Sequence, residues 1–250
     1  MYFLFSSCGN DSVALIQKAI DESLDDVHVI YSDTGWAADG WMDRVEVTKK
    51  WSESHGLKFH ITKAEGGFLG LAKKKNAFPR GGGGKFQFCT RALKIEPALK
   101  KMEELDPDRD ATCMIGIRRE ESQNRRTFPE WTEKSENHGG RELWAPLVRL
   151  DEKERNILIQ RSPLPVLHHR SKECYPCVNA RHSELRTLPE DRIQMIEATE
   201  QELGTNSKGN QIVMFSPKRY AGATGIRDVI STCQKGNGEL FGACSSGFCG

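Results

Sequence analysis

Glycine, hydroxyl and carboxylate residues are concentrated in one short stretch near the amino end of the chain, where residues 6–12 read Ser-Ser-Cys-Gly-Asn-Asp-Ser. Gly9 allows a ligand to approach the backbone closely, and Ser7 and Ser12 offer hydroxyl groups. Asp11 can hold the turn or face a magnesium ion. The stretch therefore has the residue types of a phosphate-binding turn.

A buried strand and an amphipathic helix are expected on the two sides of this turn. Tyr2–Phe5 is an aromatic and aliphatic run, and the apolar spacing after Ser12 has a helical period. The first N–H groups of a helix have no partners within it, and the helix dipole favours negative charge there. We therefore expect a phosphate-binding site at the turn. The alternative is a plain strand-to-helix turn with a Ser or Asp cap.

The order of the later apolar runs predicts a parallel sheet. A second strand is expected over Val27–Tyr31, and a strand, helix, strand order of this length requires a right-handed crossover between parallel strands. A long helix over Gly40–His55 and strands over Leu57–Ile61 and Thr112–Ile117 follow. Ligands bind at the carboxyl ends of parallel strands, so residues that follow these strands are candidates for a binding site.

Polar residues directly follow two of these strands. Asp33 and Thr34 come after the second strand, and we expect them beside the phosphate-binding turn. The alternative for Asp33 is a helix cap or turn residue. Gly116 lies near the end of the fourth strand and is followed by Arg118 and Arg125. Charge packed against a strand end is typical of an edge that faces a ligand, and an exposed charged helix start is the alternative.

Composition limits the class of protein. The 250 residues include 36 basic and 35 acidic ones, so no overall charge attracts the chain to nucleic acid or to a membrane. No apolar run approaches the length of about 18 residues that a membrane span needs, and the apolar amino end lacks a basic leader. We expect a cytoplasmic protein with no membrane partner, and the oligomeric state stays open. Residues 1–142 are expected to form an α/β domain and residues 143–250 a smaller cysteine-bearing segment.

The eight cysteines are expected to be metal ligands or reactive thiols, because the cytoplasm keeps thiols reduced. Cys174 and Cys177 form a Cys-x-x-Cys pair, a spacing used for zinc, for iron–sulfur clusters and for dithiol redox chemistry. Cys89 lies far upstream, and Cys244 and Cys249 lie downstream. Four thiolates can therefore converge if the second segment folds back over the first.

Simpler roles are expected for other cysteines and histidines. Cys113 is interpreted as a small core residue, and Cys8 as a small-residue replacement rather than a reactive thiol. His168 and His169 are close to the cysteine pair in the sequence, but a surface role is the commoner one. Residues 73–88 contain four consecutive glycines and four lysines among aromatic residues. This stretch predicts either a lid that contacts a polynucleotide or a solvated linker.

The turn at residues 6–12 resembles the pyrophosphate loop, Ser-Gly-Gly-x-Asp-Ser, of the ATP pyrophosphatase and phosphoadenosine phosphosulfate (PAPS) reductase superfamily, with Cys8 in place of the first glycine. Further similar stretches occur in the superfamily's order at Ser32–Gly35, Cys89–Pro97 and Gly116–Ser122 with Arg125. The resemblance covers roughly residues 1 to 180. It implies an adenine nucleotide α-hydrolase-like fold, in which a Rossmann-like parallel sheet flanked by helices carries a nucleotide across its strand ends.

The resemblance also implies a reaction. ATP pyrophosphatases keep the acidic loop residue, here Asp11, cleave ATP between its α- and β-phosphates, and adenylate an oxygen that sulfur then displaces. The reductases generally have a degraded loop and a Glu-Cys-Gly tail, which this chain lacks. The chain is thus most similar to the iron–sulfur ATP pyrophosphatases of DNA phosphorothioation systems. This similarity implies ATP, Mg²⁺ and a [4Fe–4S] cluster as cofactors, DNA backbone or tRNA as acceptor, and a cysteine desulfurase as sulfur donor.

Roles for single residues follow from the same resemblance. Asp11 is expected to position Mg²⁺, and Arg118 and Arg125 to stabilise charge as the α-phosphate is attacked. The cluster is expected on Cys89, Cys174, Cys177 and either Cys244 or Cys249, in a sulfur-relaying or a structural role. The nucleotide is expected on Ser7, Cys8, Gly9, Asn10, Asp11, Ser12, Asp33, Thr34, Gly116 and Arg118.

Two other functions compete with this one. A PAPS or adenylylsulfate reductase would release sulfite from a nucleotide sulfate in the presence of thioredoxin. A non-catalytic, zinc-stapled nucleic-acid-binding module would bind a colourless metal and turn over no nucleotide.

Overall fold

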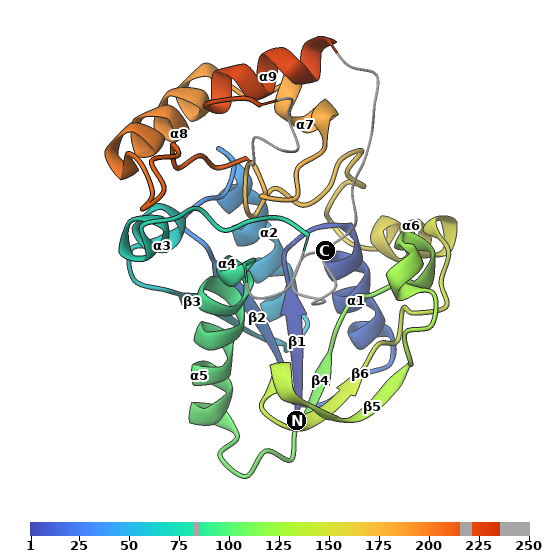
Figure 1. The fold of residues 1–250 in the computed structure, drawn as a ribbon. Helices are drawn as coiled ribbons and strands as arrows, with labels where there is room; N and C mark the ends of the chain where they lie inside the picture. Colours follow the sequence, from blue (N-terminus) through green and yellow to red (C-terminus); the bar gives the residue numbers. More distant parts are fainter. Residues whose placement is uncertain (83–85, 216–221, 236–250) are drawn as a thin grey trace.

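A six-stranded sheet with helices on both faces forms the centre of the molecule (Figure 1). The computed structural model describes residues 1–82, 86–215 and 222–235. The strand order is β3-β2-β1-β4-β6-β5, and only β5 runs antiparallel to its neighbour. The strands are β1 (Tyr2–Ser6), β2 (Val27–Asp33), β3 (Lys58–Lys63), β4 (Thr112–Met114), β5 (Trp131–Ser135) and β6 (Arg141–Trp144). The predicted α/β fold with a mostly parallel sheet is confirmed.

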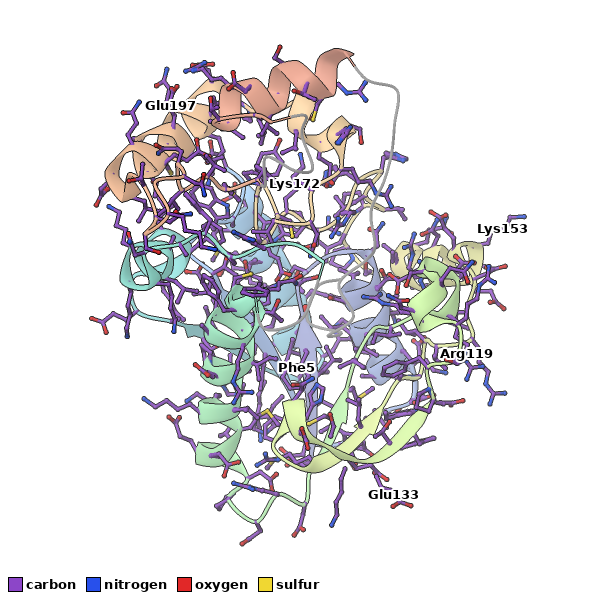
Figure 2. The ribbon with its side chains drawn as sticks, in the orientation of Figure 1. Phe5, Arg119, Glu133, Lys153, Lys172 and Glu197 are labelled. Atoms are coloured by element: carbon purple, nitrogen blue, oxygen red, sulfur yellow. The ribbon has the colours of Figure 1, made fainter. Side chains whose placement is uncertain are left out.

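Alternating residues of β1 separate the two core layers beside the sheet. Phe3 and Phe5 face one layer, which contains α5 (Glu96–Leu105), and Figure 2 labels Phe5 within it. Leu4 faces the other layer, which contains α1 (Asn10–Asp21), α2 (Trp41–Ser54) and α6 (Glu152–Gln160). A strand that buries both of its faces is expected in the middle of a parallel sheet. The apolar run at the amino end therefore becomes the central strand.

A third apolar cluster lies above the carboxyl ends of the parallel strands, where Figure 1 shows α7, α8 and α9 as a separate layer. It is built from α3 (Gly67–Lys75), α7 (His182–Arg186), α8 (Glu190–Leu203) and α9 (Ile226–Lys235). None of the helices in the described part of the chain combines the length and apolar character that crossing a bilayer requires.

Several element boundaries differ from those expected. The fourth strand, expected over residues 112–117, ends at Met114, although Ile115 and Ile117 stay buried. The helix expected from Cys89 consists of α4 (Phe88–Thr90), a π-helical turn η1 (Arg91–Ile95) and α5. Helix α3 was not predicted.

The boundary expected between residues 142 and 143 falls inside β6. This strand pairs Leu143 and Trp144 with β4, so the sheet contains residues from both sides of that boundary. Beyond β6, α6 packs on the same sheet face as α1. The segment around residues 167–177 then returns to the ends of β1 and β2.

Candidate nucleotide-binding site

The turn between β1 and α1 is shaped by its own hydroxyl groups. The backbone N–H of Ser7 donates to Ser12 Oγ at 2.9 Å, and the two serine hydroxyls are 3.0 Å apart. The N–H of Gly9 donates to Ser7 Oγ at 3.2 Å. The first turn of α1 begins directly afterwards at Asn10. The loop therefore presents the start of a helix at the carboxyl end of the central strand, where an anion is favoured.

Cys8 occupies a backbone conformation that favours glycine. Its φ is +57°, and its side chain is fully buried. The superfamily motif has its first glycine at this position, so Cys8 replaces the glycine that this backbone conformation favours. Burial raises the pKa of the Cys8 thiol to about 12, which keeps it protonated. This agrees with the interpretation of Cys8 as a small-residue replacement.

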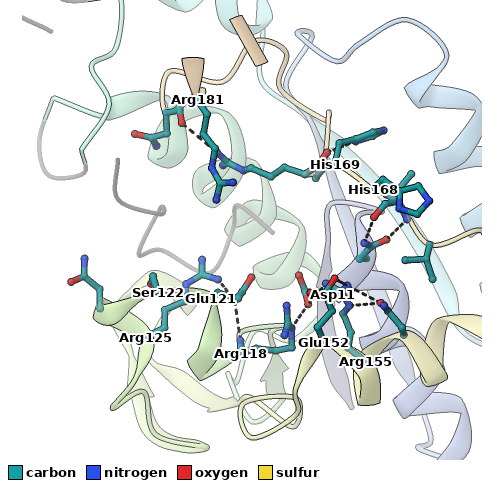
Figure 3. A pocket seen from close by; sticks show the side chains of 18 of the residues that line it. Asp11, Arg118, Glu121, Ser122, Arg125, Glu152, Arg155, His168, His169 and Arg181 are labelled. Atoms are coloured by element: carbon teal, nitrogen blue, oxygen red, sulfur yellow. Dashed lines mark hydrogen bonds and ion pairs between the residues drawn. The ribbon is translucent and has the colours of Figure 1, made fainter. Parts of the chain in front are cut away.

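Asp11 lies in the first turn of α1 and is held by two arginines (Figure 3). Arg118 Nε donates to Asp11 Oδ1 at 2.6 Å, and Arg155 Nη1 lies 3.5 Å from the same oxygen. All three side chains are less than 10% exposed. Arg118 follows β4, the strand next to β1, so the parallel topology itself brings residues 11 and 118 together.

Gly116 allows this close approach. A Cβ atom at this position would lie 3.0 Å from the Asp11 carbonyl oxygen and 3.1 Å from its carbonyl carbon. Both of these are backbone atoms, so they cannot rotate away as a flexible side chain would. Gly116 therefore sets the distance between the end of β4 and α1 and supports the site without contributing a polar group.

Arg125 lies further along the same wall. It is buried, and its Nη1 forms an ion pair with Glu121. Glu121 Oε2 also accepts a hydrogen bond from the backbone N–H of Arg118 at 3.0 Å. The two predicted catalytic arginines are thus joined through one glutamate.

These residues line a cavity of about 820 Å³, which Figure 3 shows from close by. This volume lies within the range of about 300–1,000 Å³ that is typical of small-molecule sites. Five arginines face three carboxylates around it, so the lining favours an anionic ligand. The charged lining residues are Arg118, Arg125, Arg155, Arg170 and Arg181 with Asp11, Glu121 and Glu152.

Three of these arginines were not predicted from the sequence. Arg155 lies four residues before the buried Ile159 in α6, and this spacing places both on the same face of the helix. The spacing was the one signal in the sequence that Arg155 is buried. Arg170 and Arg181 lie in irregular chain around the cysteine pair, where no periodicity marked them. His168 and His169 also line the cavity, and both are exposed.

Asp33 and Thr34 do not line this cavity. Asp33 accepts a hydrogen bond from the N–H of Gly35 at 2.8 Å and forms an ion pair with Lys63 at 2.7 Å. It borders a separate cavity of about 560 Å³. Thr34 is buried and donates through Oγ1 to the carbonyl oxygen of Glu173 at 2.8 Å. Asp33 thus takes the turn role that was the alternative, and Thr34 anchors the cysteine-bearing segment.

That segment packs directly on the phosphate-binding turn. The Asn10 side-chain amide exchanges two hydrogen bonds with the backbone of Leu167, at 2.8 and 2.9 Å. Ser171 Oγ donates to the carbonyl oxygen of Ser7 at 3.4 Å. A Cβ atom on Gly9 would lie 3.0 Å from Ser171 Cβ, so only glycine fits without displacing the segment. The segment around residues 167–177 therefore folds back over the turn at residues 6–12, which was the condition for the cysteines to converge.

Three of the predicted cluster ligands gather behind the cavity wall. The Cys174 and Cys177 thiols are hydrogen-bonded, and this contact lowers the pKa of Cys177, with further lowering from the charge of Arg170. The N–H of Asn179, which lines the cavity, donates to Cys177 Sγ at 3.4 Å. Cys89 is buried in the same apolar cluster and acts electrostatically on Cys174.

The chemistry of these donors suits a thiolate-bound group. Within the described residues, however, no three Cys, His, Asp or Glu side chains form a metal-binding group. Cys244 and Cys249 lie outside the described residues. Cys113 lies in the core layer beside β1, in agreement with its expected role.

Comparisons with known proteins identify a family for most of the chain. Residues 1–176 match the family model of the phosphoadenosine phosphosulfate reductase domain. The chain is 28% identical over 160 residues to an uncharacterized 37.8 kDa protein of Escherichia phage 186. That match covers 57% of this chain and 45% of the phage protein, so the chain spans less than half of this relative. Among solved structures, the chain is similar to a PAPS reductase from Candida auris in a phosphate complex, with a TM-score of 0.46 and 19% sequence identity. The match covers 66% of this chain and 74% of the Candida auris chain.

Proposed function

The chain belongs to the phosphoadenosine phosphosulfate reductase family, and from its site we propose that it is an ATP pyrophosphatase that adenylates an acceptor for sulfur incorporation. Membership of the family supports nucleotide binding and adenylyl-type chemistry. The choice of ATP as the nucleotide is the finer step and rests on the site alone.

The observation that carries this choice is the position of Asp11. Its carboxylate lies in the first turn of α1, at a cavity that arginines line. The carboxylate is paired with Arg118 and Arg155 through Oδ1, and Oδ2 is left for a divalent cation that accompanies the phosphates. A magnesium–triphosphate complex therefore suits this lining better than a nucleotide sulfate without a metal.

Magnesium fits the residues present. Mg²⁺ usually binds proteins through one or two carboxylates, with substrate phosphates and water completing its shell. Asp11 supplies one such carboxylate, and Glu121 and Glu152 line the same cavity. When bound, Mg²⁺ would neutralise charge on the phosphates.

The protein's own groups would position and stabilise the reacting phosphate. N–H groups at the start of α1 would hold the phosphates, and Arg118 and Arg125 would stabilise the charge that grows on the α-phosphate. The acceptor oxygen would form a bond to the α-phosphorus as the bond to the β-phosphate oxygen breaks. Pyrophosphate would leave, and AMP would leave in turn when sulfur replaces the adenylated oxygen.

The cysteine segment is the proposed source of sulfur chemistry. Cys89, Cys174 and Cys177, with Cys244 or Cys249, would hold an iron–sulfur cluster that stores or relays sulfur or supports the fold. A cysteine desulfurase is the proposed donor, and DNA backbone or tRNA the proposed acceptor. The contact of Ser171 with Ser7 supports this proposal, because it brings the segment onto the phosphate-binding turn.

A reductase is the second candidate, and one observation favours it. Cys177 accepts a hydrogen bond from Asn179, a residue of the cavity wall, and its pKa is lowered by its contact with Cys174. A thiol with a lowered pKa next to a residue of the cavity wall is the kind of nucleophile that a reductase would need.

One product analysis separates these functions. Anaerobically purified protein would be incubated with Mg²⁺ and ATP, with and without DNA or tRNA, and in parallel with PAPS or adenylylsulfate plus reduced thioredoxin. We expect pyrophosphate from ATP, increased by the correct acceptor, with AMP released in addition when a sulfur donor is supplied. Sulfite from a nucleotide sulfate, without pyrophosphate from ATP, would establish the reductase instead.

A further inference from the structure

Two arginines connect α6 to opposite ends of α1. Arg155 contacts Asp11 in the first turn of α1, and Arg161 forms a two-contact ion pair with Asp21 at its end, at 2.5 and 2.7 Å. Ile159 packs between the same helices in the core. The two arginines differ in burial, since the Arg155 side chain is 7% exposed and that of Arg161 is 55% exposed.

The burial of Arg155 needs a reason beyond holding the helices together. Removing a guanidinium from water costs several kcal/mol, whereas Ile159 and the exposed Arg161 pair attach α6 to α1 without that cost. Neighbouring residues of α6 also fix the orientation of the Arg155 guanidinium. Asn156 Oδ1 accepts hydrogen bonds from its Nε and Nη2 at 3.0 and 2.7 Å, and Glu152 lies 3.2 Å from Nη2. This leaves Nη1 aimed at Asp11.

Both arginines at Asp11 contact the same oxygen atom. Arg118 Nε and Arg155 Nη1 lie 2.6 and 3.5 Å from Oδ1. Asp11 Oδ2 makes no hydrogen bond to any residue that the structure describes. Two cations on one oxygen fix the rotation of the carboxylate and leave the other oxygen for a ligand of the cavity.

We propose that Arg155 is a positioning residue that, together with Arg118, holds Asp11 so that Oδ2 faces the metal ion of a metal–ATP complex. This inference rests on the proposed function. It adds a residue of α6 to the residues of the turn and of the strand ends that the proposed function already uses. Arg155 acts through Asp11 and not on the phosphates. Its loss should therefore weaken binding of the nucleotide only when the metal is present.

The test measures binding of α,β-methylene-ATP, which cannot be cleaved at the reacting bond. The affinity of the protein for the analogue would be measured by equilibrium dialysis, first with Mn²⁺ and again in EDTA. Arg155→Gln should weaken Mn²⁺-dependent binding by about tenfold and leave binding in EDTA unchanged, because Asp11 is the only proposed metal ligand among the partners that the guanidinium loses. Arg155→Lys, which keeps the charge, should recover most of the affinity.

Arg161→Gln is the matched control. It removes the other ion pair between α6 and α1 and should leave both affinities unchanged. Equal losses in Arg155→Gln and Arg161→Gln would show that Arg155 only joins the helices, and an equal loss with and without Mn²⁺ would show that it contacts the phosphates. Either result overturns the inference.

A further variant covers the case in which Arg155→Gln does not fold. Asn156→Ala removes the half-buried amide that orients Arg155 and keeps the guanidinium. It should weaken Mn²⁺-dependent binding by about threefold, as expected for loss of one orienting hydrogen-bond acceptor. Unchanged binding would overturn the inference. If the unaltered protein shows no metal-dependent binding of the analogue, the proposed function itself fails, and this inference fails with it.

Discussion

Single residues decide how closely the backbone segments around Asp11 approach one another. A Cβ atom on Gly116 or on Gly9 would lie 3.0 Å from a neighbouring segment, so any larger residue requires that segment to shift. Gly116 packs against the backbone of Asp11, and Gly9 packs against Ser171. The geometry of the site thus depends on these two glycines as well as on the arginines that surround it.

Replacing Gly116 with alanine should disturb the site directly. The added Cβ would meet the carbonyl of Asp11 at 3.0 Å, so α1 or the end of β4 must move. We expect a loss of about 1–3 kcal/mol in the free energy of unfolding, together with weaker Mg²⁺–ATP binding. Urea unfolding and calorimetry of nucleotide binding measure the two effects.

Gly70→Ala is the control for this substitution. Gly70 lies inside α3, and a Cβ there would meet nothing within 4 Å. Alanine should stabilise that helix by up to about 1 kcal/mol and leave nucleotide binding unchanged. If Gly116→Ala binds Mg²⁺–ATP as the unaltered protein does, the packing of Gly116 on Asp11 has no bearing on the site.

The sequence could predict residues whose position follows from the chain order. Gly116 and Arg118 come directly after a strand that neighbours β1, so their proximity to Asp11 follows from parallel topology. Arg155 could not be placed in this way. It reaches Asp11 through the packing of α6 against α1, a tertiary contact that local periodicity does not encode.

Among the elements, the interrupted helix between residues 88 and 105 connects the sheet to the cysteine segment. Its π-helical turn, Arg91–Ile95, buries Lys94, whose ammonium pairs with the buried carboxylate of Glu173. Glu173 directly precedes Cys174 and also holds Thr34 at the end of β2 through its carbonyl oxygen. A π-helical turn is often found at functional sites.

Lys94→Met should destabilise the protein strongly. It would leave the Glu173 carboxylate in the interior without its lysine partner, and breaking a buried ion pair on one side typically costs about 3–5 kcal/mol. The free energy of unfolding from a urea titration tests this value. Replacing both residues with methionine should recover most of the loss, because no buried charge then remains from this pair. A single variant as stable as the unaltered protein would contradict this role.

Element boundaries were harder to predict than element types. The strands β1 and β2 stand out as apolar runs, and β3 alternates Phe59 and Ile61 with polar residues. The strands β5 and β6 are short, and they owe their place to pairing with each other and with β4. Helix α3 contains two glycines, which weaken a helical signal. It is stabilised by burial of Phe68 and Leu71 in the third cluster.

At the scale of the whole molecule, the two segments expected from the sequence are interwoven. β6 enters the sheet, α6 packs on α1, and the chain around residues 167–177 covers the phosphate-binding turn. Sequence patterns could suggest that the cysteine segment folds back. They could not show that it supplies part of the cavity lining, because Arg170 and Arg181 lie in irregular chain.

Global stability should decrease in mild acid. Burial lowers the pKa of His138 to about 4, and burial also lowers the pKa values of His28 and His60. A histidine that is neutral in the folded protein gains a proton on unfolding, so stability falls as the pH drops from about 6.5 towards 4. For His138 this loss is on the order of 3 kcal/mol.

The contribution of His138 is measured by urea unfolding at several pH values between these limits. His138→Gln should reduce the pH dependence, whereas the exposed His169→Gln should not alter it. The same pH dependence in both variants would show that His138 does not supply it.

The most direct test of the whole account is pyrophosphate release from Mg²⁺–ATP in a single turnover, with the unaltered protein and with Asp11→Asn, in the presence of nucleic acid. We predict pyrophosphate from the unaltered protein and a decrease of on the order of a hundredfold in its release by the variant, because an amide replaces the carboxylate that faces the metal–phosphate complex. Pyrophosphate release that is undiminished in Asp11→Asn would contradict it, as would sulfite release from a nucleotide sulfate with no cleavage of ATP.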